Sequence, residues 1–472
     1  MKSIKTKHRI IKAVSALTAL VLASGMLAGC GGSSDKDSEG RTIISVGSWP
    51  PEESDALTAM NERKARFEEA NPDVVIEPDE WAFDRQTFYA KAAGGQLPTV
   101  YLSGFTEMPE IINSGYSSDI TEALKNNGLE GMFNENIMDI ISRDGKIYAF
   151  PTMSYVLGLA YNVDAFEAAG LMKEDGTPMQ PANWDEMVDF AVKIKEATGK
   201  PGIVLPTADR SGGWIFSAIA WSFGVEFMEK GEDGKWQAKF DSPEAAQALQ
   251  FIKDLKWKYD LLPASTIINA EDWYRSFAVG DGAMTVVAGD YPRRVAKYGM
   301  TPDQSGIMAI PAGPAKHVTL LGGEVMCIKN DATPDQIDAS VRWLKTRYNN
   351  ELTDEYKTNT ETTTENAKKD GQLVGIQSLS PWSDKAESLV WYRDYIEQNA
   401  NCNLNHVKLY NDFVADCPAE IKPEEPVCCQ ELYAVLDSCI QEVLTDENAD
   451  CAQIMSDANS DFQMNYLDNL AY

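Results

Sequence analysis

The stretch Asp144 to Leu171, which reads DGKIYAFPTMSYVLGLAYNVDAFEAAGL, decides how this chain is organised. Gly145 predicts a turn, and an extended run leads from it to Pro151. The apolar residues Leu157 to Tyr161 predict a strand, and Asn162 to Ala169 predicts a short helix. Because the two chain halves on either side look alike, this stretch is interpreted as a hinge crossover between them.

The segment upstream of the crossover indicates an α/β architecture. The apolar run Thr42 to Val46 predicts a strand, and the run after Ser54 predicts a helix that Asn71 and Pro72 end. Val74 to Glu77 predicts the next strand. A strand, a helix and a strand in about 35 residues make a βαβ unit, which builds a parallel sheet. Since 472 residues exceed the usual size of one core, at least two such lobes are expected.

The N-terminus has the features of a secretory signal. Residues 1–29 carry five basic residues, no acid, and the apolar run Ala13 to Gly29. The run ends in Leu27-Ala28-Gly29-Cys30, which resembles the lipobox of a lipoprotein, so Cys30 is the predicted lipidation site. An ordinary signal followed by an unrelated cysteine is the alternative. Residues 30–40 are small and polar after the cysteine, which predicts a flexible tether.

The charge of the chain limits its partners. The formal net charge is −30, and removal of the basic signal would leave the mature chain near −35. Such a field repels nucleic acid and anionic membrane surfaces. The only membrane attachment expected is therefore the lipid on Cys30.

Cysteines are concentrated near the C-terminus, and their state stays open. No pair has the C-x₂-C spacing of a zinc site, and adjacent cysteines suit neither a metal nor a mutual bridge. Disulfides outside the cell and free thiols are both possible readings. The six clustered cysteines are Cys402, Cys417, Cys428, Cys429, Cys439 and Cys451.

Several segments together resemble family 1 extracellular solute-binding proteins, the sugar-binding lipoproteins of ATP-driven importers. The first is Phe67 to Glu77 (FEEANPDVVIE), and the second is the crossover itself, with DGK-x-YxxP followed by LAYNxDxFxxAGL. The third is Trp273 to Asp290 (WYRSFAVGDGAMTVVAGD), which Tyr291 follows where the family usually has Trp. The fourth is Ile307 to Gly313 (IMAIPAG). The order of these segments, more than any one of them, carries the resemblance.

The resemblance implies a two-lobe, periplasmic-binding-protein-like fold. Each lobe would be a mostly parallel sheet flanked by helices, with a hinge between the lobes. The boundaries expected from it are 41–150 with 311–348 for the N-terminal lobe, and 151–310 with 349–472 for the C-terminal lobe, the latter including a helical C-terminal extension.

The sequence contains few catalytic signals. Outside the signal only His317 and His406 remain, and neither lies in an HExxH motif or beside a plausible cysteine partner. G-x-S-x-G, P-loop and G-x-G-x-x-G motifs after a strand are missing. A glycosidase-type carboxylate pair stays possible, because 72 acidic residues make chance pairs plentiful and only geometry can select one.

Aromatic residues at loops and element ends give the strongest indication of a site. Such residues line the crevice in which open α/β folds bind ligands. Flat rings pack on the apolar face of a sugar, and charged or amide groups bind its hydroxyl rim. The candidate ligand-binding residues are Trp49, Tyr155, Trp214, Trp273, Tyr291 and Trp382 for the faces, and Asp209, Arg210, Asp290 and Glu324 for the rim.

These observations predict a binding protein rather than an enzyme. It would capture a carbohydrate, expected to be an oligosaccharide, by hinge closure and without a cofactor or metal. The resemblance implies two permease subunits and an ATPase as partners, and a monomer anchored on the outer face of the cell membrane. The alternatives are another solute, such as a peptide, polyamine or metal chelate, a surface-anchored glycoside hydrolase, and a purely structural lipoprotein.

Overall fold

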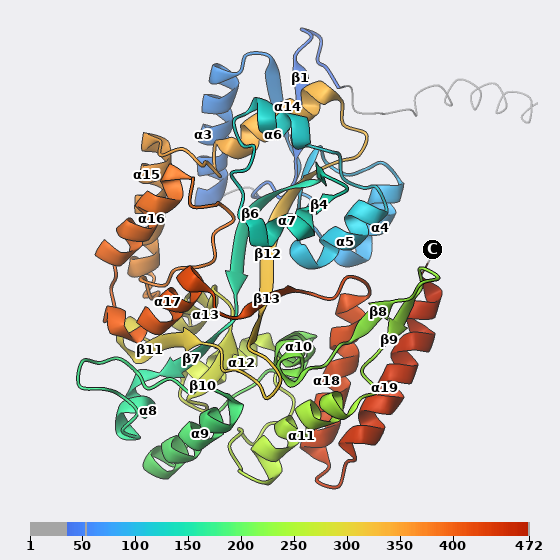
Figure 1. Ribbon diagram of the computed structural model, residues 1–472. Coiled ribbons are helices and arrows are strands. Elements are labelled where there is room, and N and C mark those ends of the chain that lie inside the picture. The colour runs from blue at the N-terminus through green and yellow to red at the C-terminus, as the bar shows by residue number, and fades with distance from the viewer. Residues whose placement is uncertain (1–34, 52–53, 471–472) are drawn as a thin grey trace, which may run out of the picture.

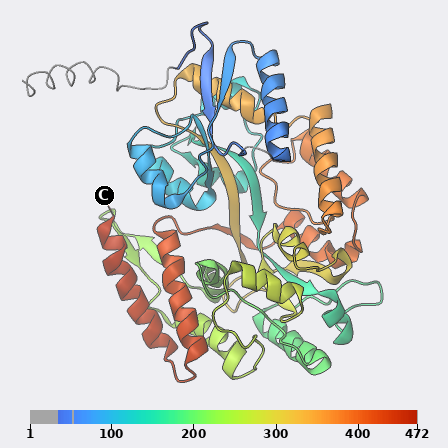
Figure 2. The same ribbon diagram turned by 180° about the vertical axis from the view of Figure 1, so that it is seen from behind.

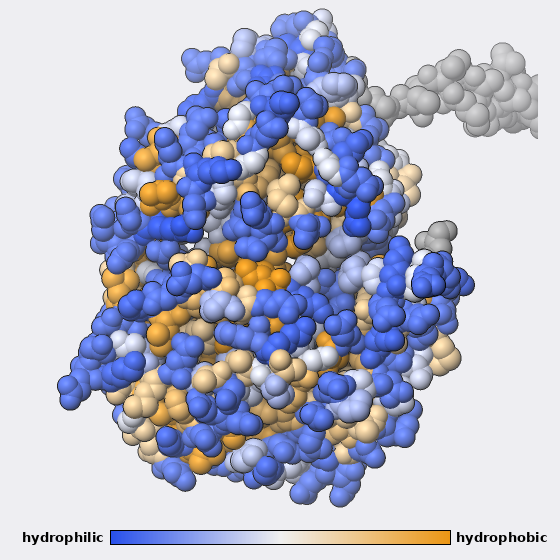
Figure 3. Space-filling view, in the orientation of Figure 1, coloured by the Kyte–Doolittle hydropathy of each residue, from blue (hydrophilic) through white to orange (hydrophobic). Residues whose placement is uncertain are grey.

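The computed structural model describes residues 35–51 and 54–470. These residues form an upper and a lower body, joined at a waist that β6 and β12 cross (Figure 1). The upper body contains β1, β2 and β3, and the lower body contains a separate three-stranded sheet. Hydrophilic residues cover most of the face in Figure 3, and hydrophobic residues gather at the waist.

The larger sheet has the order β13-β12-β3-β1-β2, with β6 on the other side of β12. β1 pairs in parallel with β2 and β3, as the βαβ pattern predicts. β12 is antiparallel to β3 and β6, and its first residues pair in parallel with β13. The strands are β1 (Thr42–Val46), β2 (Val74–Pro78), β3 (Val100–Gly104), β6 (Ala149–Val156), β12 (Val318–Ile328) and β13 (Glu420–Pro423).

The smaller sheet departs from the expected parallel pairing. It consists of β10 (Met284–Val287), β7 (Gly158–Asn162) and β11 (Ser305–Ala309), and β7 is antiparallel to both neighbours. The reason is the path of the chain. β7 carries it from β6 into the lower body, whereas β11 brings it back toward β12. The prediction of a mostly parallel sheet in each lobe is therefore wrong for this sheet.

Helices cover both sheets. α11 shows why these segments are helical: Pro243 occupies its first turn, and the Ser242 side chain accepts the N–H of Ala245. The helices of the upper body are α3 (Asp55–Ala70), α4 (Arg85–Ala93), α5 (Met108–Asn113), α6 (Thr121–Asn126), α7 (Glu135–Ile141), α14 (Pro334–Lys345), α15 (Asp354–Lys369) and α16 (Glu387–Gln398). Those of the lower body are α8 (Val163–Ala168), α9 (Trp184–Thr198), α10 (Ser211–Phe223), α11 (Pro243–Trp257), α12 (Ala270–Ala278), α13 (Tyr291–Ala296), α17 (Lys408–Asp416), α18 (Cys429–Thr445) and α19 (Cys451–Asn465).

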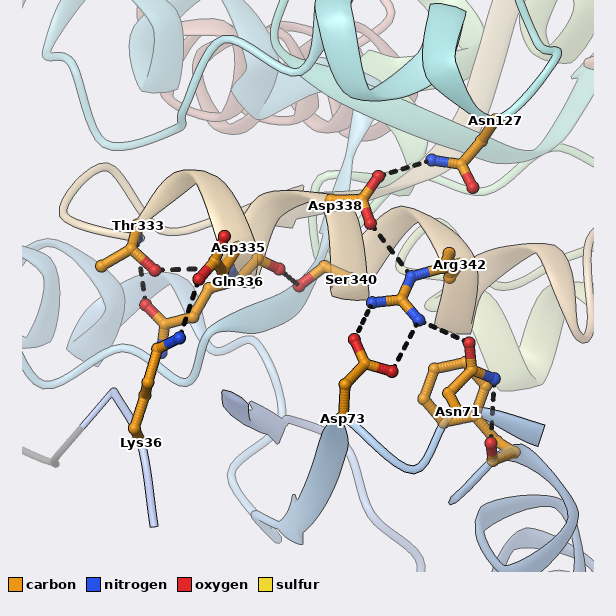
Figure 4. A network of polar contacts seen from close by, with 11 residues as sticks. Lys36, Asn71, Asp73, Asn127, Thr333, Asp335, Gln336, Asp338, Ser340 and Arg342 are labelled. Atoms are coloured by element: carbon orange, nitrogen blue, oxygen red, sulfur yellow. Dashed lines mark hydrogen bonds and ion pairs between the residues drawn. The ribbon is translucent and has the colours of Figure 1, made fainter. Parts of the chain in front are cut away.

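Polar contacts fasten α14 to the first strands (Figure 4). Thr333 and Gln336 form a capping box at its start, as their spacing predicts. Near its end, Arg342 forms an ion pair of 2.8 Å with Asp73, which precedes β2. The segment after the crossovers therefore returns to the body that the N-terminus builds.

The last residues of the predicted tether are held against the upper body. Lys36 forms an ion pair of 3.0 Å with Asp335, and Asp37 accepts hydrogen bonds from Arg41. Residues 35–40 are thus a turn packed beside β1, because Arg41 and α14 supply partners that the sequence pattern does not show. The signal, Cys30 and the start of the tether lie outside the described residues.

The chain after β12 contributes helices to both bodies. α15 is linked to α3 of the upper body by the pair Arg66–Glu355, at 3.1 Å. α18 and α19 lie side by side against α10 and α11 in the lower body (Figure 2). The lobe boundaries expected at 150, 310 and 348 stay a prediction.

All seven cysteines of the described ranges are unpaired. Within those ranges no helix has both the length and the apolar character that a membrane span requires.

Candidate functional site

A cavity of about 270 Å³ lies at the waist. Its walls come from four parts of the fold. Thr106 belongs to the upper body, and Tyr155 and Gly323 lie on the crossing strands β6 and β12. The start of α10 contributes Asp209, Arg210, Ser211 and Trp214, and the C-terminal segment contributes Glu424, Gln430 and Tyr433.

The start of α10 is shaped by α18. Asp209 and Arg210 both have positive φ, at 56° and 68°, which turns the chain into the helix. The carboxylate of Asp437 on α18 accepts the N–H of Arg210 at 2.6 Å and the N–H of Gly213 at 2.7 Å. A Cβ on Gly213 would lie 2.6 Å from the Cα of Tyr433, so only glycine permits this approach. The two helices therefore position Arg210, Trp214 and Tyr433 on one wall.

Tyr155 and Trp214 form the aromatic part of the wall. Their rings meet edge to face, with centroids 6.5 Å apart. Tyr155 pairs with Gly322 across β6 and β12, and its ring covers the space that a Cβ of Gly322 would fill. Burial raises the pKa of the Tyr155 hydroxyl, and the negative charges of Glu424 and Asp290 raise it further. The ring is thus fixed in a site surrounded by carboxylates.

Glu424 connects the two bodies inside the cavity. Its carboxylate accepts a short hydrogen bond from the hydroxyl of Thr106, in the upper body. It also accepts the hydroxyl of Tyr433, on α18, at 2.8 Å. Burial raises the pKa of Glu424 to about 7, and these hydrogen bonds oppose the rise because they favour the charged form. Glu424 therefore changes charge near neutral pH at the junction of the two bodies.

An ion-pair group links α4 to α18 beside the cavity. Arg85 lies 3.1 Å from Glu107 (Nη1 to Oε1) and 3.6 Å from Glu431 (Nη2 to Oε2). All three side chains are at most one-third exposed, so water screens these pairs less than fully exposed pairs. Together with the contact between Thr106 and Glu424, this group holds the upper body against α18 and the segment that precedes it.

Six of the ten candidate residues lie at or beside the cavity. Tyr155, Asp209, Arg210 and Trp214 line it. Asp290 and Glu324 are close enough for their charges to act on Tyr155, although they do not line the cavity. That these residues bind a ligand stays a prediction.

Trp49 and Trp382 belong to the core of the upper body instead. Trp49 is 4% exposed and stacks on Trp343 with centroids 6.2 Å apart. Trp382 is 7% exposed and stacks on Phe133 at 5.1 Å. Each ring therefore packs against aromatic partners distant in sequence, which explains why its place near a turn misled the prediction of ligand contact.

Trp273 and Tyr291 belong to the core of the lower body. Trp273 donates its Nε1–H to the hydroxyl of Thr285 at 2.6 Å, and its ring stacks on Tyr274. Tyr291 is fully buried and accepts the hydroxyl of Ser305 at 3.1 Å. Since the polar atom of each side chain has an internal partner, neither reaches the cavity as the prediction required.

The sequence reading missed the residues that the C-terminal segment brings to the cavity. Glu424 follows β13 directly, and Gln430 and Tyr433 lie on the first turns of α18. Thr106, Ser211 and Gly323 were missed as well. Glu424 is 318 residues from its partner Thr106, so no local spacing reveals the contact. The sequence feature that could have drawn attention to Glu424 is the pair of acidic residues between Pro423 and Pro426.

The described residues contain no group of three or more His, Cys, Asp or Glu side chains that could hold a metal ion. The polar groups of the cavity are hydroxyls, carboxylates, an amide and a guanidinium, and the aromatic rings of Tyr155, Trp214 and Tyr433 line it with them. Such a wall can bind the hydroxyl groups and the apolar face of a polyhydroxylated molecule.

Comparison with known proteins agrees with this architecture. The sequence profile of the bacterial extracellular solute-binding proteins matches residues 50–351. A putative binding protein of Brucella abortus is 26% identical over 259 residues, which are 54% of this chain and 60% of the relative. A sn-glycerol-3-phosphate-binding periplasmic protein of Salmonella typhimurium is 25% identical over 291 residues, 57% of this chain and 63% of the relative. The chain thus spans about 60% of the length of these relatives.

A solved structure shows the same fold. Maltose-bound MalE3 of T. maritima superposes with a TM-score of 0.62 at 21% sequence identity. The match covers 89% of this chain and 99% of that protein. The two bodies and the crossing strands are therefore those of a two-lobe periplasmic binding protein.

Proposed function

Because this chain belongs to the bacterial extracellular solute-binding proteins, we propose that it captures a carbohydrate at the waist cavity and delivers it to an ABC importer. The observation that carries the proposal is the composition of the cavity wall. Thr106 comes from the upper body and Trp214 from the lower body, so one ligand can contact both. The edge-to-face rings of Tyr155 and Trp214 offer the apolar surface that a sugar ring requires.

The mechanism is closure of the two bodies around the ligand. The segments that must bend are those that cross the waist, which include β6, β12 and residues 399–407 between α16 and α17. A ligand stabilises the closed state by the contacts that it makes to both bodies at once. The closed form then presents to the permease subunits a surface that the open form lacks.

The cavity suits one end of an oligosaccharide. Its volume of about 270 Å³ is at the lower limit of small-molecule sites, which span roughly 300–1,000 Å³. The rest of a longer sugar would extend along the waist toward Glu324 and Asp290. Peptides and polyamines are the alternative solutes.

One observation favours a glycoside hydrolase as a second candidate. Glu424 and Asp209 line the same cavity, and burial raises the pKa of Glu424 to about 7, as a general acid requires. Against this role, the carboxylate of Glu424 already accepts two hydroxyl donors. A cleavage assay decides between the two functions.

Thermal unfolding of residues 31–472 with mono- and oligosaccharides tests the proposal. A bound sugar should stabilise the protein by about 2.7 kcal/mol at a concentration 100 times its Kd. Trp214→Ala should lose this stabilisation, whereas Trp257→Ala should keep it, because Trp257 is a partly exposed tryptophan on α11 away from the cavity. Recovery of intact sugar supports binding, and cleaved sugar supports the hydrolase. If no sugar raises the unfolding midpoint, the carbohydrate proposal fails.

The anchor is a separate part of the proposal. The lipobox-like segment supports attachment of lipid to Cys30 and a place on the outer face of the cell membrane. Cys30→Ala should release the protein from membranes, and metabolic labelling with a fatty acid should mark only the unchanged chain. Retention of the Cys30→Ala variant on membranes would contradict the anchor.

A further inference from the structure

The charges of the cavity are arranged against anions. Of the described residues that line it, Asp209 and Glu424 are acidic and Arg210 alone is cationic. Beyond Tyr155, the positive charges of Arg347 and Arg293 oppose the charge of Glu324, and Asp290 pairs with Arg294 at 3.0 Å. Among the described residues that line the cavity, a ligand therefore faces two carboxylates and one cation.

The second feature is the start of α10, where a helix would ordinarily attract an anion. The free N–H groups of a helix N-terminus and its dipole favour phosphate or carboxylate groups. Here the N–H groups of Arg210 and Gly213 already donate to Asp437. Asp437 is 6% exposed, so it occupies this position as an internal anion. These donors are consequently not offered to a ligand.

We propose that the cavity selects by charge: it accepts uncharged polyhydroxylated solutes and excludes phosphate esters and carboxylates, with Glu424 and Asp437 setting this selectivity. The inference rests on the proposed function and narrows its substrate class. Both kinds of ligand occur among similar proteins, since one relative is named for sn-glycerol 3-phosphate and one solved structure holds maltose. Glu424 acts through its own charge in the cavity, and Asp437 is a positioning residue that acts through the α10 amides.

Two isosteric variants test the proposal with sn-glycerol 3-phosphate and inorganic phosphate as probes. Glu424→Gln removes a charge from the cavity wall. Asp437→Asn removes a charge and presents an NH₂ group to the backbone, which frees one α10 amide. Each variant should bind the two anions at least about tenfold more tightly than the unchanged protein, measured by calorimetry at low salt and at about pH 8.5, where Glu424 is charged although burial raises its pKa to about 7.

Two carboxylates that do not line the cavity provide controls, one for each variant. Glu425 is buried beside Glu424 but bonds to Trp221 Nε1 at 2.9 Å and does not line the cavity. Asp450 accepts the N–H of Ala452 at the start of α19, away from the cavity. Glu425→Gln and Asp450→Asn should therefore gain no anion binding.

The outcomes separate this inference from the proposed function. The inference is overturned if the unchanged protein binds sn-glycerol 3-phosphate at least as tightly as any neutral sugar, or if Glu424→Gln gains no more than its control. If Asp437→Asn fails to fold, judged by circular dichroism, Glu424→Gln alone decides. If the variants gain anion binding but the unchanged protein binds no neutral sugar, the charge selectivity is supported and the proposed capture of a carbohydrate is refuted.

Discussion

Replacing Glu424 with glutamine should stabilise the protein above neutral pH and change its stability much less at about pH 5. The reason is the cost of burying a charge where the carboxylate contacts Thr106 and Tyr433. Burial raises the pKa of Glu424 to about 7 from an ordinary value of 4.5. Between these values the folded protein keeps a proton that the unfolded chain releases. The free energy of unfolding therefore falls as pH rises through this interval and loses no more above it.

The size of the effect follows from the two pKa values. Their difference corresponds to roughly 3 kcal/mol of lost stability once Glu424 is fully charged. Glutamine carries no charge and can still accept a hydroxyl through its amide oxygen. We therefore expect Glu424→Gln to unfold with a free energy about 1–3 kcal/mol larger than that of the unchanged protein at about pH 8.

Urea unfolding at a series of pH values measures this difference. Glu420→Gln is the control, because Glu420 lies four residues away on β13, is half exposed, and pairs with Lys316 at the surface. Its difference from the unchanged protein should not vary in the same way with pH. The reasoning is refuted if the stability of Glu424→Gln and that of the unchanged protein stay parallel from about pH 5 to about pH 8.

Three further substitutions separate the site from the core. Gly213→Ala should destabilise the protein by about 1–3 kcal/mol, since its Cβ would collide with the backbone of Tyr433, and hydrogen exchange in α10 should report the loosening. Gly322→Ala should displace the ring of Tyr155 and weaken sugar binding in calorimetry at least about tenfold, and unchanged affinity would show that this ring is not a ligand contact. Trp49→Ala should cost about 3–5 kcal/mol in urea unfolding yet leave sugar affinity unchanged, because the ring lies in the core.

Much of the local structure could be predicted because it depends on short spacings. The strand Thr42–Val46 has the predicted bounds, and the helix after Ser54 ends at Ala70, before Asn71 and Pro72. The spacing of Thr333 and Gln336 predicted their capping box in the same way. These features require partners only a few residues apart, so the sequence shows them directly.

The site could be predicted only in part. Tyr155 and Trp214 line the cavity, but the similarly placed Trp49 and Tyr291 are core residues. A position in a loop or at the end of an element can be predicted for an aromatic residue. The residues that pack against its ring cannot be predicted from that position. Whether a ring faces ligand or core depends on distant partners, such as Trp343 for Trp49.

The sequence alone determined the family, the α/β character and the hinge crossover, because these are written in ordered motifs and short periodic patterns. Only the tertiary structure decided which residues line the cavity. Asp437 reaches Arg210 across 227 residues, and Glu424 reaches Thr106 across 318. Because the C-terminal segment packs against the waist, it buries Glu424 and so raises the pKa of that residue. It also places the Asp437 carboxylate on the N–H groups at the start of α10. These properties arise from long-range packing, which a local pattern does not encode.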